Sequence, residues 1–294
     1  MSNNEIKKFV EDELKSLCTN ISLNYKENME KRKDNPFLPL DDNIQKYMAL
    51  GRSMDSQLGN RIQRIIFLLS RYKYDDISVP NFTSIKMEKD EIILTLYSIP
   101  TNLEAKYQNK NFNPFIQYVY INKNLSEEKI KKRLHIKAKY NNLETQTFKF
   151  KISSNTKFKE TYSEFSNKCY PVDLIIFSIS KNANGKSFIN GVNAYEIKMG
   201  GNLDTKNAKS NALEVLKNKK VFDFIESNKS SFATCYGKCS DAIKKELNEQ
   251  KLGLKKPNDF WNCILPDSLS YSEFIEIYGK AFEDAKIKDT LCDL

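Results

Sequence analysis

The sequence predicts an α/β fold in which a central mixed β-sheet is flanked by helices. Two nearly continuous apolar segments, 172–179 and 192–199, are typical of strands buried on both faces. Amphipathic helical patterns come before them, and helices alternate with a strand after residue 200. The 294 residues are 40% hydrophobic, enough to build a core. No repeats or long linkers interrupt the chain, so we expect a single domain over residues 1–294.

The N-terminal quarter is predicted to be mainly helical. Residues 4–18 carry apolar side chains at the three-to-four spacing of an amphipathic helix, and a proline-containing loop follows at 34–42. Residues 43–72 have the same periodicity. We expect two helices there, separated near Gly51, with Ser53 or Asp55 as the N-cap of the second.

The remaining elements are predicted from alternation, turn residues and periodicity. Strands are expected at 91–99, 115–121 and 145–152, with a basic helix or strand at 126–139 between the last two. The two buried strands flank a hairpin turn at 180–191. After them we expect a helix near 205–226, a strand at 230–236, and helices near 240–250 and 271–287.

The charge balance favours a polyanionic partner. The chain has 47 Lys and Arg against 38 Asp and Glu, which gives a formal net charge of +9. Nucleic acid is the leading candidate partner, and a surface of solvated lysines is the alternative. The charged N-terminus has no signal-peptide pattern, and no segment approaches the ~18 apolar residues of a membrane span. We therefore expect a cytoplasmic protein without a membrane partner.

Histidine and cysteine usage excludes several chemistries. His135 is the only histidine, so sites that need several histidines cannot be assembled. The six cysteines show no disulfide spacing, and reduced thiols are expected. Cys235, Cys239 and Cys263 are a weak alternative zinc set, because no CxxC pair repeats.

Two acids and a lysine are predicted to meet at the end of the buried sheet. Side chains alternate along a strand, so Glu196 and Lys198 project to the same face. Asp173 lies early in the preceding buried strand and reaches Glu196 if the two strands are neighbours. Unpaired charges on buried strands are costly, so such groups are retained mainly when paired or functional. An incidental ion pair is the structural alternative.

This set of residues suits the hydrolysis of a phosphodiester bond. Asp173 and Glu196 offer oxygen ligands for Mg²⁺, and the backbone carbonyl of Ile197 offers a third. Lys198 would orient or help to deprotonate the attacking water and would offset charge on the phosphate. We therefore predict a magnesium-dependent active site at Asp173, Glu196 and Lys198.

The same residues resemble the PD-(D/E)xK nuclease motif, with Pro171-Val172-Asp173 as its first half and Glu196-Ile197-Lys198 as its second. More specifically, "MALGRSMDSQLGNRIQ", "EIKMGGNLDTKNAKSN" and "DFWNCI" resemble type II restriction endonucleases of the TdeIII/MjaII type. The resemblance covers about residues 45–75 and 170–285. It implies a restriction-endonuclease-like fold and Mg²⁺-dependent cleavage of double-stranded DNA at GGNCC-like sites. Residues 83–150 match nothing and are expected to be a strand-rich insertion that reads DNA.

The resemblance also assigns roles to residues. It makes Asp173 and Glu196 metal ligands and Lys198 the catalytic lysine. Many of these nucleases add an acid from an early helix, where this chain offers only Gln57 and Gln63, with Asp55 nearby. The turn after the active strand is expected to contact DNA through Asn202, Asp204, Lys206, Asn207 and Lys209. The alternative for these residues is a solvated helix start capped by Asn202 or Asp204.

The expected partners follow from the restriction hypothesis. A palindromic site is most simply cut on both strands by a homodimer, and a DNA methyltransferase is the expected genetic partner. Two alternatives remain open at this point. One is a basic DNA- or RNA-binding protein whose acids only stabilise the sheet, and the other is a repair or recombination nuclease of the same fold.

Overall fold

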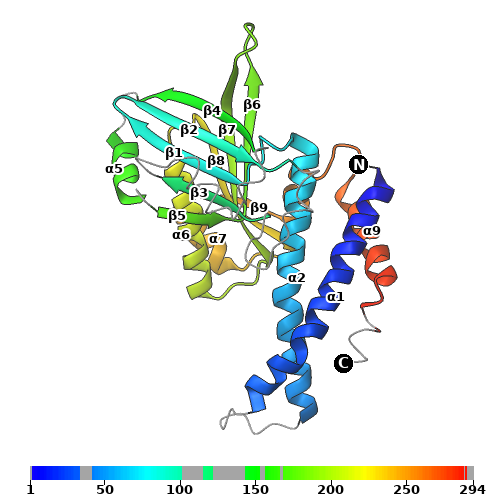
Figure 1. The fold of residues 1–294 in the computed structure, drawn as a ribbon. Coiled ribbons are helices and arrows are strands. Elements are labelled where there is room, and N and C mark those ends of the chain that lie inside the picture. Colours follow the sequence, from blue (N-terminus) through cyan, green and yellow to red (C-terminus); the bar gives the residue numbers. More distant parts are fainter. Residues whose placement is uncertain are drawn as a thin grey trace. The chain divides into compact units, whose positions relative to one another are not determined.

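The computed structural model describes residues 2–33, 42–100, 115–121, 143–152, 156–165, 168–287 and 289. The fold class is α/β, with mixed β-sheets flanked by helices (Figure 1). The chain divides into two compact units: residues 1–66 with 267–294 form unit 1, and residues 67–266 form unit 2. The expectation of a single domain stays a prediction, as does a DNA-reading role for residues 83–150.

Unit 1 is helical. Its elements are α1 (Asn3–Lys33), the first part of α2 (Asp42–Tyr74) and α9 (Tyr271–Asp284). The apolar stripe predicted within residues 4–18 is buried at Ile6, Val10, Leu14 and Leu17, while Phe9 is half-buried; beyond the predicted segment, Ile21 is buried as well. α1 contacts α9, where Lys7 pairs with Asp284 at 2.6 Å. Ser270 and Glu273 form a capping box that starts α9.

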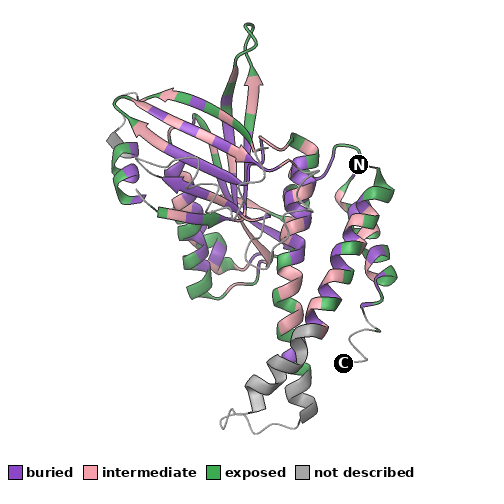
Figure 2. Ribbon diagram, in the orientation of Figure 1, coloured by how far each residue is buried: buried purple, intermediate pink, exposed green. Residues whose placement is uncertain are grey.

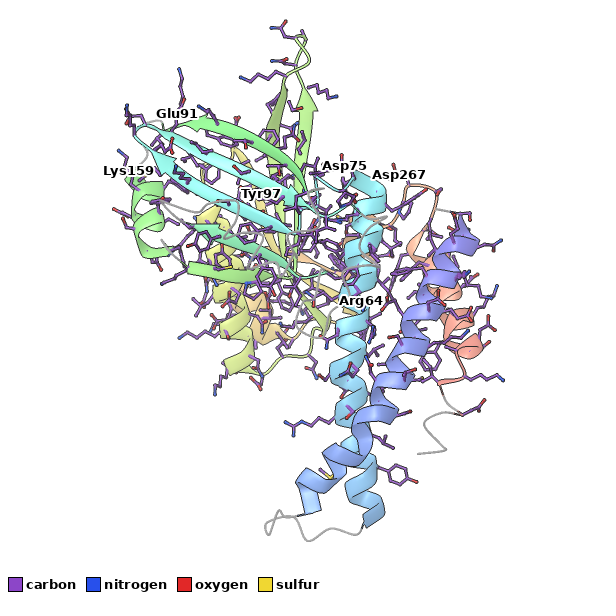
Figure 3. The ribbon with its side chains drawn as sticks, viewed as in Figure 1. Arg64, Asp75, Glu91, Tyr97, Lys159 and Asp267 are labelled. Carbon is purple, nitrogen blue, oxygen red and sulfur yellow. The ribbon has the colours of Figure 1, made fainter. Side chains whose placement is uncertain are left out.

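A buried ion cluster joins α1 to α2 within unit 1. Glu13 of α1 lies 3.2 Å from Arg61 and 2.9 Å from Arg64, both on α2. The side chains of Glu13 and Arg61 are each only 8% exposed. Figure 3 labels Arg64, which lies on α2 and pairs with Glu13. Because these three charged groups are shielded from solvent, removing any one of them would leave the others without full compensation of their charge.

The predicted break in the second helical segment is wrong. α2 runs without interruption from Asp42 to Tyr74 and passes through Gly51, while Ser53 and Asp55 lie inside the helix. A single glycine in a helix costs only about 1 kcal/mol relative to alanine. That cost is too small by itself to end a helix of this length.

Unit 2 contains a five-stranded sheet. Its strand order is β4-β2-β1-β3-β5, and only the β1–β3 pair is parallel. The strands are β1 (Phe82–Glu88), β2 (Glu91–Ser98), β3 (Gln117–Ile121), β4 (Glu144–Lys151) and β5 (Lys168–Val172). β2, β3 and β4 were predicted, while β1 and β5 were not. The basic segment predicted at 126–139 lies outside the described residues.

A second, four-stranded sheet carries the predicted acids. Its order is β6-β7-β8-β9, with β6 antiparallel to β7 and the other pairs parallel. The strands are β6 (Leu174–Lys181), β7 (Ser187–Gly200), β8 (Ser227–Tyr236) and β9 (Gly253–Lys255). In the described part of unit 2, the helices outside α2 are α5 (Thr156–Phe165), α6 (Thr205–Val221), α7 (Asp241–Glu249) and α8 (Pro257–Ile264).

The two buried strands are neighbours, as predicted, but β6 is an edge strand of its sheet and not a central one. Its first four residues, 174–177, are nevertheless all buried. The two sheets of unit 2 share one apolar core, which includes Ile85, Leu94, Val119, Phe177 and Val192. The apolar run at the start of β6 is therefore explained by its burial between the two sheets. The far end of the β6–β7 hairpin is exposed (Figure 2).

Candidate functional site

Asp173 occupies the junction between the two sheets of unit 2. It is the one residue between β5, which belongs to the five-stranded sheet, and β6, which begins the four-stranded sheet. The side chain of Gln117, only 1% exposed, fixes this junction. Its Nε2 donates to the carbonyl of Ile175 at 2.9 Å, and its Oε1 accepts from the Ile175 N–H at 2.6 Å. The outer edge of β6 is thus tied to the neighbouring sheet beside Asp173.

Glu196 and Lys198 lie on β7, the strand next to β6. They share one face, as predicted, and Lys198 Nζ lies 2.8 Å from Glu196 Oε1. The Glu196 side chain is 14% exposed and that of Lys198 38% exposed. β8 pairs in parallel with this part of β7, with Thr234 opposite Lys198. The lysine therefore reaches solvent, while the carboxylate stays close to the sheet.

Asp173 meets β7 through the backbone of Ile197. The Asp173 Oδ2 accepts a hydrogen bond from the Ile197 N–H at 2.7 Å. The N–H and C=O of one strand residue point to the same side of the strand, so the Ile197 carbonyl also faces the Asp173 side. The structure thus brings together Asp173, Glu196 and the Ile197 backbone, which the sequence analysis proposed as one set of metal ligands.

The electrostatics of the set favour an added cation. Burial raises the pKa of the Asp173 carboxyl, and the Ile197 N–H and the Lys198 ammonium oppose that rise. Burial also raises the pKa of Glu196, and the nearby charge of Asp173 raises it further. For Lys198, burial acts to lower the pKa, but the charge and hydrogen bond of Glu196, together with the charges of Asp173 and Glu214, outweigh burial and the pKa is raised. Two carboxylates that resist ionisation side by side would be stabilised by a divalent cation.

The residues fit a magnesium ion in number and kind. Mg²⁺ is commonly held by one or two carboxylates and keeps several waters. Asp173 and Glu196 supply two carboxylates, and the Ile197 carbonyl lies on the same side as Asp173. Among the described residues no group of three or more His, Cys, Asp or Glu side chains could hold a metal. A cage made only of side chains, including the weak zinc alternative, is not present in that part of the chain.

A third acid near the set was not predicted. The charge of Glu214, on α6, acts on Asp173, Glu196 and Lys198. It pairs with Lys217 at 3.1 Å, and the Lys217 ammonium lies 3.9 Å from the centre of the Tyr170 ring. The signal in the sequence was a polar stripe along α6 beside its buried alanines, at Asn207, Asn211, Glu214 and Asn218.

The turn after β7 is fixed by close packing. A Cβ on Gly201 would lie 2.8 Å from the Cα of Cys239, so only glycine fits. The Ser240 N–H donates to the Gly201 carbonyl at 2.8 Å, and the Ser240 hydroxyl donates to the Leu203 carbonyl. The turn is therefore held against the loop that precedes α7.

The residues expected to contact DNA follow this turn. Asp204 is the N-cap of α6 and accepts from the backbone and side chain of Asn207, at 2.8 and 2.9 Å. The alternative reading of Asp204 as a cap is thus confirmed. Asn202, Lys206 and Lys209 are exposed. A DNA contact by any of these five residues stays a prediction.

The helix residues offered as further contributors lie in unit 1. Gln57 and Gln63 are half-buried on α2, and Asp55 is exposed. Asp173, Glu196 and Lys198 all belong to unit 2. A contribution from Gln57 or Gln63 to the active site therefore stays a prediction.

Comparison of the chain with family models, with curated proteins and with solved structures gave no match. No helix of the described part of the chain is long and apolar enough to cross a membrane. The chemistry of the Asp173, Glu196 and Lys198 set is therefore the basis on which a function can be argued.

Proposed function

We propose that this chain is a magnesium-dependent endonuclease that cuts double-stranded DNA at a specific site, as type II restriction enzymes do. The observation that carries the proposal is the convergence of Asp173, Glu196 and Lys198 at one end of a buried sheet. Asp173 lies between β5 and β6, and Glu196 and Lys198 lie on β7, up to 25 positions further along the chain. One hydrogen bond and one ion pair nevertheless connect the three residues through β7.

Each residue has a role that its position allows. Asp173 and Glu196 would hold the ion, with the Ile197 carbonyl as a further ligand. When bound, Mg²⁺ supplies neutralising charge and lowers the pKa of a coordinated water. Lys198, which is part-exposed beside Glu196, would orient the attacking water and offset charge on the phosphate. The ion pair between Lys198 and Glu196 would then weaken, because the Glu196 carboxylate would also bind the cation.

The partners proposed from the sequence fit this role. A formal net charge of +9 favours DNA, and nonspecific affinity should fall steeply as salt rises, because bound counterions are released. A homodimer is the expected form on a palindromic, GGNCC-like site, and light scattering with and without duplex measures it. A site-specific DNA methyltransferase encoded beside this chain in a cytoplasmic restriction–modification system is the expected genetic partner.

The test is incubation of the purified chain with phage DNA and Mg²⁺, with Asp173→Asn as the inactive control. Discrete fragments are expected for a restriction enzyme. A smear favours a repair or recombination nuclease of the same fold. DNA that stays intact but shifts in a gel favours the basic binding protein, and it would overturn the catalytic role of Asp173, Glu196 and Lys198.

A further inference from the structure

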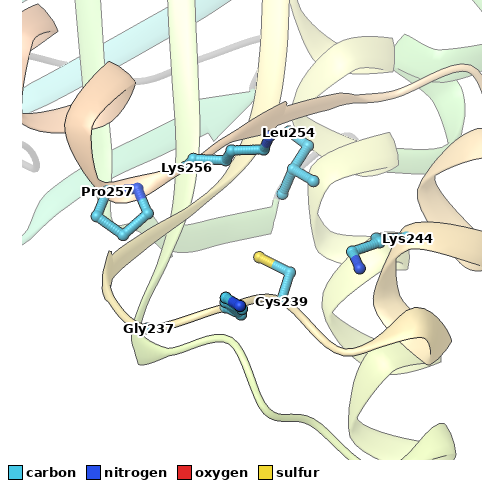
Figure 4. Close-up of a pocket in the computed structure, with 7 residues that line it drawn as sticks. Gly237, Cys239, Lys244, Leu254, Lys256 and Pro257 are labelled. Carbon is cyan, nitrogen blue, oxygen red and sulfur yellow. The ribbon is translucent and has the colours of Figure 1, made fainter.

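A pocket lies in unit 2, at the carboxyl ends of β8 and β9. Its volume is about 310 Å³, and its lining is shown in Figure 4. The lining residues come from the loop after β8, from α7 and from the segment joining β9 to α8: Gly237, Lys238, Cys239, Lys244, Leu254, Lys256 and Pro257. This volume is at the small end of the range of ligand pockets, which runs from about 300 to 1,000 Å³.

The pocket combines an apolar wall with positive charge. Leu254, Pro257 and the thiol of Cys239 line it, and no acidic residue is among its lining residues. Lys244 pairs with Asp241 at 2.8 Å. Lys238 and Lys256 are exposed, and no ion pair engages either of them within the described residues. Such a lining suits a ligand that joins an anion to a flat apolar body.

The pocket is connected directly to the turn that follows the candidate active strand. Cys239, one of its lining residues, is the residue against which Gly201 packs. β7, β8 and β9 are parallel, so their carboxyl ends share the edge near which Glu196 and Lys198 lie. Strands are about 4.8 Å apart, which places β9 about 10 Å from β7. At about 3.4 Å per nucleotide along one strand, that span corresponds to roughly three nucleotides.

We infer that this pocket holds one nucleotide of the DNA strand that is cut, a few nucleotides from the cleaved bond. The phosphate would lie against the ammonium groups of Lys238 and Lys256. The sugar and base would lie against Leu254 and Pro257. This inference rests on the proposed function, because it takes the strand held at Asp173 and Glu196 as the ligand.

The experiment measures binding of thymidine 5′-monophosphate by calorimetry in EDTA, so that metal at the active site plays no part. The doubly substituted Lys238→Gln, Lys256→Gln protein should bind at least tenfold more weakly than the unmodified chain. Lys229→Gln, an exposed lysine at the other end of β8, removes charge without touching the pocket and should bind normally. Thymidine and inorganic phosphate, tested alone, should each bind more weakly than the nucleotide.

The outcomes separate the pocket from the catalytic proposal. If the pocket variants and Lys229→Gln bind the nucleotide as well as the unmodified chain does, the inference is overturned. Equal affinity for phosphate and nucleotide would also overturn it, because the apolar wall would then have no role. A chain that binds the nucleotide through these lysines but never cuts DNA would refute the proposed nuclease function and would still support the pocket as a nucleotide-binding site. In a cleaving enzyme, the double variant should raise KM with little change in kcat.

Discussion

Asp173 and Ile197 are joined by a hydrogen bond of 2.7 Å from the Ile197 backbone N–H to the Asp173 carboxylate. This bond fixes the acid at the start of β6 against the strand that carries Glu196 and Lys198. A backbone donor has no freedom to turn away, so the carboxylate is positioned before any metal binds. A carboxylate has two oxygen atoms with about four lone-pair sites, so it can accept this hydrogen bond and also coordinate a cation.

The first prediction concerns Asp173→Asn and pH. Because the Asp173 pKa is raised in the folded chain above its ordinary value of 3.8, the stability it contributes is present below that value and is lost as pH rises through the folded pKa. An asparagine does not ionise and can still accept the Ile197 N–H. In EDTA the variant should therefore become more stable than the unmodified chain as pH rises above about 3.8. Melting temperatures between pH 3.5 and 7 measure this difference.

Added metal should reverse that order. A ligand that binds only the folded state stabilises it by about 2.7 kcal/mol at one hundred times its Kd. Mg²⁺ or Ca²⁺ should raise the melting temperature of the unmodified chain and have little effect on Asp173→Asn. An equal rise in both proteins would refute a metal site at this carboxylate.

The second prediction is that Lys198→Ala removes cleavage but not DNA binding. The Lys198 side chain is 38% exposed, so its ion pair with Glu196 should contribute no more than about 1 kcal/mol to the free energy of unfolding. The measurements are a Mg²⁺ cleavage assay, a gel shift in Ca²⁺ and a melting curve. Lys181→Ala, on the exposed end of the hairpin, is the matched control. Cleavage at a near-normal rate by Lys198→Ala would exclude the catalytic role.

The third prediction concerns Gln117, which does not belong to the candidate site. Gln117→Leu leaves the buried N–H and C=O of Ile175 without their partner, at a cost of about 1–3 kcal/mol for each unsatisfied group. Because Ile175 follows Asp173 by two residues, cleavage should fall further than the loss of stability explains. Measuring activity well below the melting temperature separates the two effects. A variant that is destabilised but fully active would argue against this positioning role.

The fourth prediction concerns the turn after β7. Gly201→Ala would place a methyl group 2.8 Å from the Cys239 Cα, and the required shift should cost about 1–3 kcal/mol. Gly279→Ala is the control, because it lies in α9 with nothing within 4 Å of the new Cβ. The control should gain about 0.5–1 kcal/mol. Urea unfolding measures both, and similar shifts in the two variants would contradict the close packing at Gly201.

The fifth prediction concerns unit 1. Glu13→Ala removes the carboxylate between Arg61 and Arg64 and should lower the free energy of unfolding by about 3–5 kcal/mol. Lys15→Ala removes an exposed ion pair with Glu11 and should cost less than about 1 kcal/mol. Chemical denaturation of both variants gives the comparison. A small effect of Glu13→Ala would show that the arginines find other partners.

The sequence predicted the arrangement of Asp173, Glu196 and Lys198 better than it predicted the sheets. The two-residue period of a strand places Glu196 and Lys198 on one face wherever the strand lies, and this local rule was confirmed. The partner of β7 was also predicted, because a short polar turn separates the two strands. The sequence pattern could not show that β6 is an edge strand buried by a second sheet. A strand in the centre of a sheet and an edge strand covered by another sheet both give the same apolar run.

Three of the described strands, β1, β5 and β9, were missed, and the residues of the first two explain why. β1 begins with Phe82 and contains Lys86 and Glu88, and its burial falls off along its length, so it does not alternate. β5 is only five residues long and contains Pro171. Proline inside a strand argues against a central strand, and β5 is indeed at the edge of its sheet. Tertiary packing decided both cases.

The position of Asp173 between two sheets means that the acid pair is assembled from both. Asp173 follows β5 of the five-stranded sheet and is held to β7 by its bond to Ile197, whereas Glu196 lies within β7 itself. The two carboxylates therefore come together only when the two sheets of unit 2 are packed against each other, and the Gln117 side chain bonds one sheet to the other at Ile175, two residues from Asp173.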